Sequence, residues 1–494
     1  MEALNHLFMS FQIALAPMNL FLCFCGALIG TLVGVLPGLG PAASISLLLP
    51  LSFALTPVQA IILLSGIYYG SMYGGSTTSV LVNIPGEAAS VVTCLDGYQM
   101  ARKGRAGPAL GIAAIGSFIA GTLSVVLLMV LSPPLAKFAL KFGPVEFVSL
   151  SLLGLTLVTY LSGGSMIKAL IMACVGLLLG FVGVDVVTGV ERFTLHIPPL
   201  LDGVGLVPAV MGLFGISEVL LNLEESAQKR EILEGKITHL MPTRQDLKDS
   251  AGPIARGSIL GFFLGVIPGG GAVLASFISY AMEKKLSREP ETFGQGNIRG
   301  VAGPESANNA GAAGAFVPLL TLGIPCNAVI AILMGGLLIH GVEVGPRLFS
   351  DRPEIFWGVV GSMYLGNLML LVINLPLIGI WVKILKVRYS LLFPMIFFFC
   401  LIGAYTTGNT VYDIYVMVVF GVAGFLMKKY GYEPAPLVLA LVLGPIMERA
   451  FRQSLIISGG SYSIFLEKPI SALFVFAAAF VLISPLIFRK RPNL

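Results

Sequence analysis

Charged residues are scarce in this 494-residue sequence, at 11% of the total, whereas soluble domains contain about a quarter. No Asp, Glu, Lys, Arg or His occurs between Leu7 and Gly86. Hydrophobic residues make up 56% of the chain, and the mean hydropathy is +0.92. A soluble fold cannot bury so much apolar surface, so the composition excludes one and predicts an all-α polytopic membrane protein in a lipid bilayer.

Cysteine and histidine are rare as well, with 6 and 4 residues. The cysteines are scattered without a CxxC pair or a Cys/His cluster, so we expect apolar packing rather than a metal centre or a disulfide. The net charge of +5 is too small to indicate a nucleic-acid partner. HExxH is absent, and Asp185 has no aspartate partner in a membrane segment, which disfavours an intramembrane protease. We therefore predict no enzyme activity and no cofactor.

Apolar segments of about the length of a bilayer span alternate with irregular regions rich in Gly, Pro, Ser, Thr and Asn. The regular segments are 107–134, 145–162, 166–184, 204–222, 355–382, 390–406, 411–427, 435–450 and 470–488. The irregular regions are 26–100 and 257–346. We expect the regular segments to be ordinary transmembrane helices.

The two irregular regions resemble each other. GVLPGLG in the first matches GVIPGGG in the second, which aligns Pro37 with Pro268 at an offset of 231 residues. VNIPGEA then matches LGIPCNA, which aligns Pro85 with Pro325 at an offset of 240 residues. Two looser matches keep the same order, so we predict two repeats. They cover 12–222 and 253–452, with a linker at 223–252 between them and an extra C-terminal helix and basic tail at 453–494.

The distribution of basic residues predicts that the second repeat is inverted relative to the first. The linker carries five Lys and Arg residues, which places it in the cytoplasm by the positive-inside rule. Spans counted backwards from the linker and from the basic tail put the matching loops 135–144 and 383–389 on opposite sides. Four basic residues fall outside, against the rule: Lys137, Lys141, Arg449 and Arg452. Inverted repeats are the design of many secondary transporters.

Each repeat has a Pro-Gly break inside an apolar segment. In the second repeat, residues 257–282 carry no charge, and PGGG divides them into two arms. Each arm is about 16 Å long as helix, roughly half a bilayer. A re-entrant hairpin and a span unwound in its middle both fit these lengths. In either case free N–H groups attract an anion and free carbonyl oxygens attract Na⁺, which predicts a site near the midplane.

Uncharged polar residues near the breaks supply further ligands, because hydroxyl and amide groups bind carboxylates and, through their oxygen atoms, Na⁺. The candidate substrate-binding residues are Pro37, Gly38, Gly40, Ser76, Thr77, Asn83, Pro268, Gly269, Gly270, Gly271, Asn308 and Asn309. The candidate Na⁺ ligands are Thr78, Asn83, Asn309 and Asn327. The competing interpretation is structural, with hydroxyls bonded within their own helix and amides bridging helices. Glu305 in ESANNAG is a further possible ligand, and the alternative is that it caps a helix or lies in a loop. We expect Asp185 to lie in a solvated outer loop.

Three stretches resemble the large membrane subunit of tripartite tricarboxylate transporters. They are GTLVGVLPGLGPAASISLLLPL, YGGSTTSVLVNIPGEAASVVTCLDGYQMARKGRAGPAL and PESANNAGAAGAFVPLLTLGIP. One departure is IPCN at 324–327, where the resemblance leads us to expect Gly after the proline. The resemblance implies a multi-pass permease of the bacterial inner membrane that takes up citrate, other tricarboxylates or related carboxylates by cation symport. It also implies two partners, a periplasmic substrate-binding protein and a small membrane subunit.

Residues and resemblance together favour a secondary active transporter of small organic carboxylates, coupled to Na⁺ or H⁺. Na⁺ is the first choice, because the repeats offer oxygen ligands but few buried carboxylates or histidines for a proton relay. An anion channel is the alternative, and an intramembrane enzyme is less favoured. We expect an elevator-like mechanism, in which the two break regions move against a scaffold formed by 107–222 and 355–450.

Overall fold

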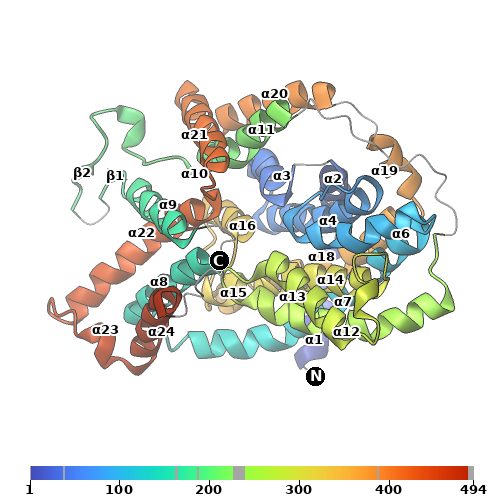
Figure 1. The fold of residues 1–494 in the computed structure, drawn as a ribbon. Helices are drawn as coiled ribbons and strands as arrows, with labels where there is room; N and C mark the ends of the chain where they lie inside the picture. Colours follow the sequence, from blue (N-terminus) through green and yellow to red (C-terminus); the bar gives the residue numbers. More distant parts are fainter. Residues whose placement is uncertain are drawn as a thin grey trace.

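The computed structural model describes residues 2–36, 39–161, 165–185, 188–225, 240–385 and 389–487. Helices dominate this part of the chain (Figure 1), and its two short strands form one antiparallel pair, β1 (Gly183–Val184) and β2 (Glu191–Arg192). The main helices of the first half are α1 (Glu2–Ala14), α2 (Pro17–Val35), α3 (Pro41–Leu48), α4 (Pro57–Val82), α7 (Ala106–Ala139), α8 (Pro144–Leu161), α9 (Met166–Gly180), α10 (Leu206–Val210) and α11 (Ser217–Glu225). Short turns of other helix types are η1 (Leu49–Ala54), η2 (Ala88–Ser90), η3 (Cys94–Tyr98) and η5 (Met211–Ile216), with α5 (Val91–Thr93) and α6 (Gln99–Arg102) between η2 and α7.

The second half begins after the linker. Its helices are α12 (Arg244–Val266), α13 (Gly271–Leu286), α14 (Arg299–Gly314), α15 (Phe316–Leu322), α16 (Ala328–Ile339), α18 (Pro353–Asn374), α19 (Ile378–Ile384), α20 (Tyr389–Gly408), α21 (Val411–Lys429), α22 (Pro434–Ile457), α23 (Ile464–Glu467) and α24 (Pro469–Ile487).

Seven helices in the described ranges are long and apolar enough to cross a membrane. They are Pro17–Val35, Ala106–Ala139, Pro144–Leu161, Leu206–Glu224, Pro353–Asn374, Val411–Lys429 and Pro434–Ile457. Shorter apolar helices occupy three other segments expected to span, at Met166–Gly180, Phe393–Gly408 and Pro469–Ser484. The prediction of an all-α polytopic membrane protein is therefore confirmed.

Local sequence signals set the ends of the helices that carry the breaks. Thr56 caps α4, because its hydroxyl accepts the N–H of Gln59 while the Gln59 side chain accepts the N–H of Thr56. Asn83 ends α4 in the left-handed conformation, with φ 58°. Thr243 and Asp246 form the same capping box at the start of α12. These caps satisfy backbone groups that the first turn of each helix leaves free.

Glycines let two pairs of helices approach closely. α2 packs along α4 through one set of glycines and α12 packs along α14 through another. The two sets are Gly26, Gly30 and Gly34 on α2, and Gly257, Gly261 and Gly265 on α12. A Cβ on Gly30 would lie 2.5 Å from the backbone oxygen of Ile67, and one on Gly261 would collide with that of Ala307. The two glycines are 231 residues apart and their two partners 240, the offsets of the sequence repeat.

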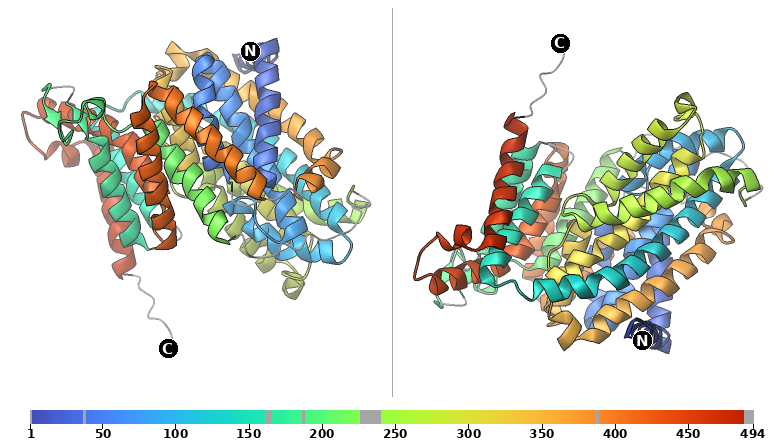
Figure 2. Two further views of the ribbon diagram at one scale, coloured as in Figure 1. Left: turned by 90° about the horizontal axis from the view of Figure 1, so that it is seen from above. Right: turned by 90° about the horizontal axis from the view of Figure 1, so that it is seen from below.

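The helices divide into a central body and outer groups. Figure 2 shows α8, α9, α22 and α24 as a bundle standing beside the larger body, and α22 packs on α9 and α8 while α24 packs on α8. A second outer group joins α10, η5 and α11 with α20 and α21. We expected α7 and α18 in the scaffold, but both pack on helices of the break regions. α7 packs on α14, α12 and α4, and α18 packs on α2 and α4.

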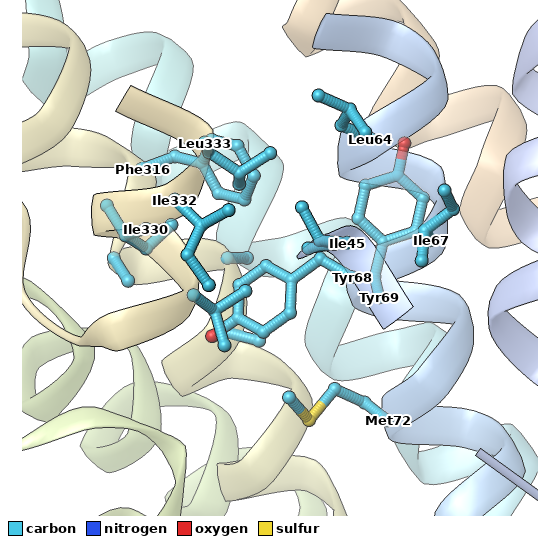
Figure 3. Close-up of a cluster of buried hydrophobic side chains, with 14 of the residues drawn as sticks. Ile45, Leu64, Ile67, Tyr68, Tyr69, Met72, Phe316, Ile330, Ile332 and Leu333 are labelled. Carbon is cyan, nitrogen blue, oxygen red and sulfur yellow. The ribbon is translucent and has the colours of Figure 1, made fainter. Parts of the chain in front are cut away.

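The apolar core joins the two halves. Figure 3 shows side chains of α4 facing side chains of α15 and α16, with Tyr68, Ile330 and Ile332 among them. Tyr68 and Phe316 lie with their ring centroids 6.1 Å apart. The break regions of the two halves therefore share one hydrophobic core, which fixes the polar groups around the breaks relative to each other.

Candidate functional site

The first Pro-Gly break joins α2 to α3. Pro37 and Gly38 lie outside the described residues. Gly40 immediately precedes α3, and a Cβ added to it would meet no atom of the described residues within 4 Å. The N-terminus of α3 therefore has open space beside it, as an anion approaching free backbone N–H groups requires.

The second break joins α12 to α13. Gly269 (φ 78°) and Gly271 (φ 52°) are left-handed, a conformation that side chains disfavour. The N–H of Gly269 donates to the backbone oxygen of Cys326 at 2.8 Å, and Gly270 donates to Ile267 at 2.9 Å. A Cβ on Gly271 would meet no described atom within 4 Å. This break therefore combines a constrained turn with open space, among the described residues, at the start of a helix.

The two breaks lead into helices that pack differently. After Pro268, α13 packs alongside both α12 and α14, the arrangement of a helical hairpin. After the first break, α3 packs mainly against α4, η5 and α16. Of the two geometries that fit the sequence, the hairpin therefore describes the second break.

Each half has a further break, which begins at a left-handed residue. Asn83 ends α4 and Gly323 ends α15, with φ 58° and 68°, and they are 240 residues apart. The side chain of Asn83 is exposed rather than directed into the core. Cys326 is buried, its Sγ lies 3.4 Å from the backbone oxygen of Val266, and it is not left-handed. The left-handed residue of this turn is Gly323, not Cys326. The turn therefore accommodates Cys326 without strain, although the resemblance led us to expect Gly there.

Three predicted hydroxyls on α4 are buried and have different surroundings. Ser76 donates to Oε2 of Glu305 at 2.5 Å. Thr77 lines a small cavity of about 10 Å³, the space of about one water, together with Ser117 of α7 and Asn374 of α18. Thr78 donates to the backbone oxygen of Val35 at the end of α2, at 2.8 Å. Thr78 thereby joins α4 to the first break, as the structural interpretation of hydroxyls expects.

The three predicted amides of the second half connect it to the first half. The Nδ2 of Asn308 donates to Oε1 of Glu87 at 3.0 Å, and the Nδ2 of Asn309 donates to the hydroxyl of Ser117 at 2.7 Å. Asn327 caps α16 through its Oδ1 and lies with its Nδ2 3.4 Å from the hydroxyl of Tyr68. The Oδ1 of Asn308 is buried and has no hydrogen-bond partner in the described part of the chain. Asn308 thus presents a fully buried ligand atom without a partner among the described residues.

Two buried carboxylates lie beside the predicted residues; sequence reasoning missed Glu87 and left Glu305 as either a ligand or a helix cap. Glu87 and Glu305 are 6% and 0% exposed. The alternative that Glu305 caps a helix or lies in a loop is wrong, because α14 already begins at Arg299 and carries Glu305 into the core. Thr93 and Ser76 donate to its two oxygens. Their positions in the sequence could have indicated them, because each glutamate directly borders a polar stretch without charge.

A third buried carboxylate holds a loop. Oδ1 of Asp96 in η3 accepts the N–H groups of Gly294 at 2.9 Å, Gly296 at 2.7 Å and Asn297 at 2.7 Å, while Oδ2 accepts the hydroxyl of Tyr280 at 2.9 Å. Four donors satisfy this carboxylate, so its role is to fix the loop before α14 against the first half.

Asp185 corrects another expectation. It is 4% exposed rather than solvated, and it pairs with Arg452 at 2.6 Å and with Arg192 at 3.6 Å. Arg192 also pairs with Glu448 at 2.6 Å. The network ties the β1–β2 hairpin to α22, which is a structural function.

A cleft of about 990 Å³ lies between the central body and the outer bundle. Its walls come from the end of α7, the start of α8, residues 202–206, 322–347 and α22. Arg347 and Arg449 line it, and neither guanidinium has an ion-pair partner among the described residues. Gly323 and Ile324 of the second half's later break line it too. Asp202 and Glu343 also line the cleft, so the four charged side chains sum to zero. The cleft is large enough for a small organic molecule, and its two guanidinium groups are the ones that suit a carboxylate.

Comparisons with known proteins agree with this picture. A family model described as the Tripartite tricarboxylate transporter TctA family matches residues 20–439. The chain is 51% identical over 472 residues to an Agrobacterium vitis protein described as an uncharacterized 52.8 kDa protein in the TAR-I ttuC' 3' region, which covers 96% of this chain and 94% of that protein. It is 50% identical over 212 residues to an uncharacterized protein in the TAR-II ttuC' 3' region of the same organism, 43% of this chain and 88% of that one. No solved structure matches the chain.

Proposed function

Because the chain belongs to the tripartite tricarboxylate transporter TctA family, we propose that it is the permease through which tricarboxylates or related small carboxylates are taken up with a cation. The cleft beside Gly323 carries the proposal, since it presents two unpaired guanidinium groups at a helix break, within the part of the chain that the structure describes. Arg347 and Arg449 attract the anion from water, and the breaks receive it deeper in the protein. Span counting from the basic residues puts this cleft on the outer side, where a binding protein delivers its ligand.

The recurring contacts of the break regions support inverted repeats. Asn308 contacts Glu87, and Tyr68 and Asn327, their counterparts at an offset of 240 residues, contact each other. Each pair joins a helix of one half to the residue after the break of the other half. Such reciprocal contacts are expected of two units related by a pseudo-two-fold axis, the architecture on which alternating access is built.

Uptake of a multivalent anion needs a driving ion. Moving a negative charge inward against a negative-inside potential costs about 2.3 kcal/mol per charge for each 100 mV. Co-transported cations offset this cost. The proposal therefore includes coupling to Na⁺ or H⁺, and it disfavours a channel, which could not accumulate the substrate.

The central body and the outer groups suggest how the permease moves. We assign α2 to α4 and α12 to α16 to the moving part, together with α7 and α18, which pack on them. The outer bundle of α8, α9, α22 and α24 and the group of α20 and α21 form the scaffold. A small membrane subunit has apolar outer helix surfaces available there, such as Phe476 and Phe480 of α24, which are 65% and 61% exposed.

Counterflow in proteoliposomes tests the proposal without any ion gradient. Vesicles loaded with unlabelled citrate, or with another di- or tricarboxylate, should take up the same labelled compound transiently above its external concentration. The purified binding protein and small subunit are added in a second arm. Failure of every carboxylate in both arms would contradict the proposed function.

A further inference from the structure

The two buried glutamates lack a compensating positive charge. Glu87 and Glu305 form no ion pair with Lys, Arg or His in the part of the chain that the structure describes. The groups that donate hydrogen bonds to their carboxylate oxygens are neutral: Ala89 and Asn308 for Glu87, Thr93 and Ser76 for Glu305. A buried carboxylate without a counter-charge costs several kcal/mol, so the pair requires a proton or a metal cation.

The two carboxylates lie on either side of one turn of α4. A Cβ on Gly75 would lie 2.8 Å from Cγ of Glu87, which shows how closely this side chain follows the helix. The next residue, Ser76, contacts Glu305 at 2.5 Å. Asn308, one turn after Glu305 on α14, contacts Glu87. Each half of the chain supplies one of the two carboxylates to the same place.

A second observation at this place points to a ligand. Asn308 is 1% exposed, its amide faces Glu87, and its Oδ1 has no partner in the described ranges. A carbonyl-type oxygen is a ligand for a hard cation and an acceptor for a protonated carboxyl group. The hydroxyl oxygens of Ser76 and Thr93 complete an oxygen-rich environment.

We propose that Glu87 and Glu305, with Asn308 between them, form the binding site of the coupling cation, which contributes one positive charge as Na⁺ or as a proton. The inference rests on the proposed function, and it replaces Thr78, Asn83, Asn309 and Asn327 as the expected ion ligands. Since the two carboxylates come from different halves, the ion at this site stabilises their contact. Release of the ion leaves two negative charges together, which favours their separation.

Other titratable groups surround this site and could contribute to a pH response. Tyr68 and Tyr73 on α4 and Cys94 in η3 are near the two carboxylates. Across α14, Gly303 faces Glu283, which is paired with Arg256 at 2.6 Å. Asp96 is held by its four donors. Glu283 has a cation and Asp96 has four donors, whereas Glu87 and Glu305 have no cation and two donors each to their carboxylate oxygens within the described ranges.

Gradient-driven uptake by the reconstituted permease with its partners tests the inference, once wild-type counterflow has established transport. Glu305→Gln and Glu87→Gln keep the shape and remove the charge, and Thr93→Val removes one hydroxyl at nearly constant volume. Glu146→Gln is the matched control, because Glu146 is also buried and accepts a neutral N–H, that of Gly143 at 2.8 Å, but lies on α8. Uptake is measured under a Na⁺ gradient at fixed pH and under a pH gradient without Na⁺.

We expect the rate of uptake driven by the coupling ion to fall at least tenfold in both glutamine variants. Thr93→Val should raise the half-saturating concentration of the coupling ion several-fold. Glu146→Gln should match the wild type. A binding readout guards against misfolding: at fixed pH, NaCl should raise the Tm of the wild type more than choline chloride does, and the variants should lose that difference. For a proton, the same loss appears as a Tm that no longer depends on pH between about 5 and 9.

The inference is overturned if wild-type protein accumulates substrate and both glutamine variants keep its dependence on Na⁺ and pH. In that case the glutamates are permanently protonated structural groups. A wild-type protein without counterflow would instead refute the proposed function, so the two failures are distinguishable.

Discussion

Asn308 on α14 donates a hydrogen bond to Glu87, the residue that lies just after the later break of the first half, at 3.0 Å. Their counterparts 240 residues away, Tyr68 on α4 and Asn327 after the later break of the second half, are also in contact, at 3.4 Å. One pair carries a charge and the other does not. The same pattern of contacts therefore occurs in both halves. After its later break, the first half has the ionisable Glu87 where the second half has the neutral helix cap Asn327.

Locking the moving part to the scaffold should stop transport. A Cβ on Gly154 of α8 would lie 3.4 Å from Cγ2 of Ile324, so cysteines at both positions are close enough for a disulfide. In a background without the native cysteines, oxidation of Gly154→Cys with Ile324→Cys should abolish uptake, and a reductant should restore it. The control pair, Ser149→Cys with Ser471→Cys, joins two scaffold helices whose hydroxyls are 2.5 Å apart and should leave uptake intact. Full uptake by the cross-linked test pair would contradict the assignment of moving parts.

Substitution of a glycine at the contact between α2 and α4 should lower the stability of the fold. Gly30→Val places a side chain against the backbone of Ile67, where a Cβ has only 2.5 Å, and overpacking of this kind costs about 1–3 kcal/mol. The Tm in detergent should fall by several degrees, with a lower yield of folded protein. Gly379→Val serves as the control, because a Cβ there meets no atom within 4 Å. An unchanged Tm for Gly30→Val would refute the close approach of the two helices.

A bulky side chain at the first break should reduce uptake and leave stability unchanged. Gly40→Leu has open space around its Cβ, so the fold and the Tm should hold. Uptake should drop at least tenfold, because the side chain occupies the place where substrate approaches the start of α3. Gly379→Leu on α19 is equally unhindered among the described residues, and it should transport normally. Normal uptake by Gly40→Leu would exclude the first break from the substrate site.

Removing charge from the cleft should weaken capture of the substrate. Arg347→Gln and Arg449→Gln should each raise the KM for carboxylate uptake several-fold, and the double variant more, with a smaller effect on the maximal rate. The effect should shrink at high ionic strength, since salt screens exposed charges. Arg352→Gln provides the control, because Arg352 is exposed but pairs with Glu354 at 3.8 Å and does not line the cleft. An unchanged KM in the double variant would remove the cleft from the entry path.

Sequence patterns predicted the helices and the places where they break, because both depend on local residue order. Apolar segments became helices, and Thr56, Asn83 and Thr243 act as the caps their residue types favour. The offsets of 231 and 240 residues reappear in the contacts of Gly30 and Gly261, since side-chain size decides which helices can pack closely.

The charged parts of the site could not be predicted in the same way. Burial of Glu305 depends on α14 starting six residues before it and packing against α12, α7, α13 and α4, which is long-range information. Asp185 was expected in solvent because its cation partner Arg452 is far away in sequence. The cleft of Arg347 and Arg449 forms between segments of both halves that a linear pattern does not bring together.

Concentrative uptake is the measurement that tests the central claim most directly. The permease, reconstituted with its small subunit and supplied with its binding protein, is given a labelled carboxylate outside the vesicles and an inward Na⁺ or proton gradient. The account predicts internal substrate at several times the external concentration, collapsing when an ionophore dissipates the gradient. Uptake that stops at equal concentrations and ignores the ionophore would contradict coupled transport and indicate a channel.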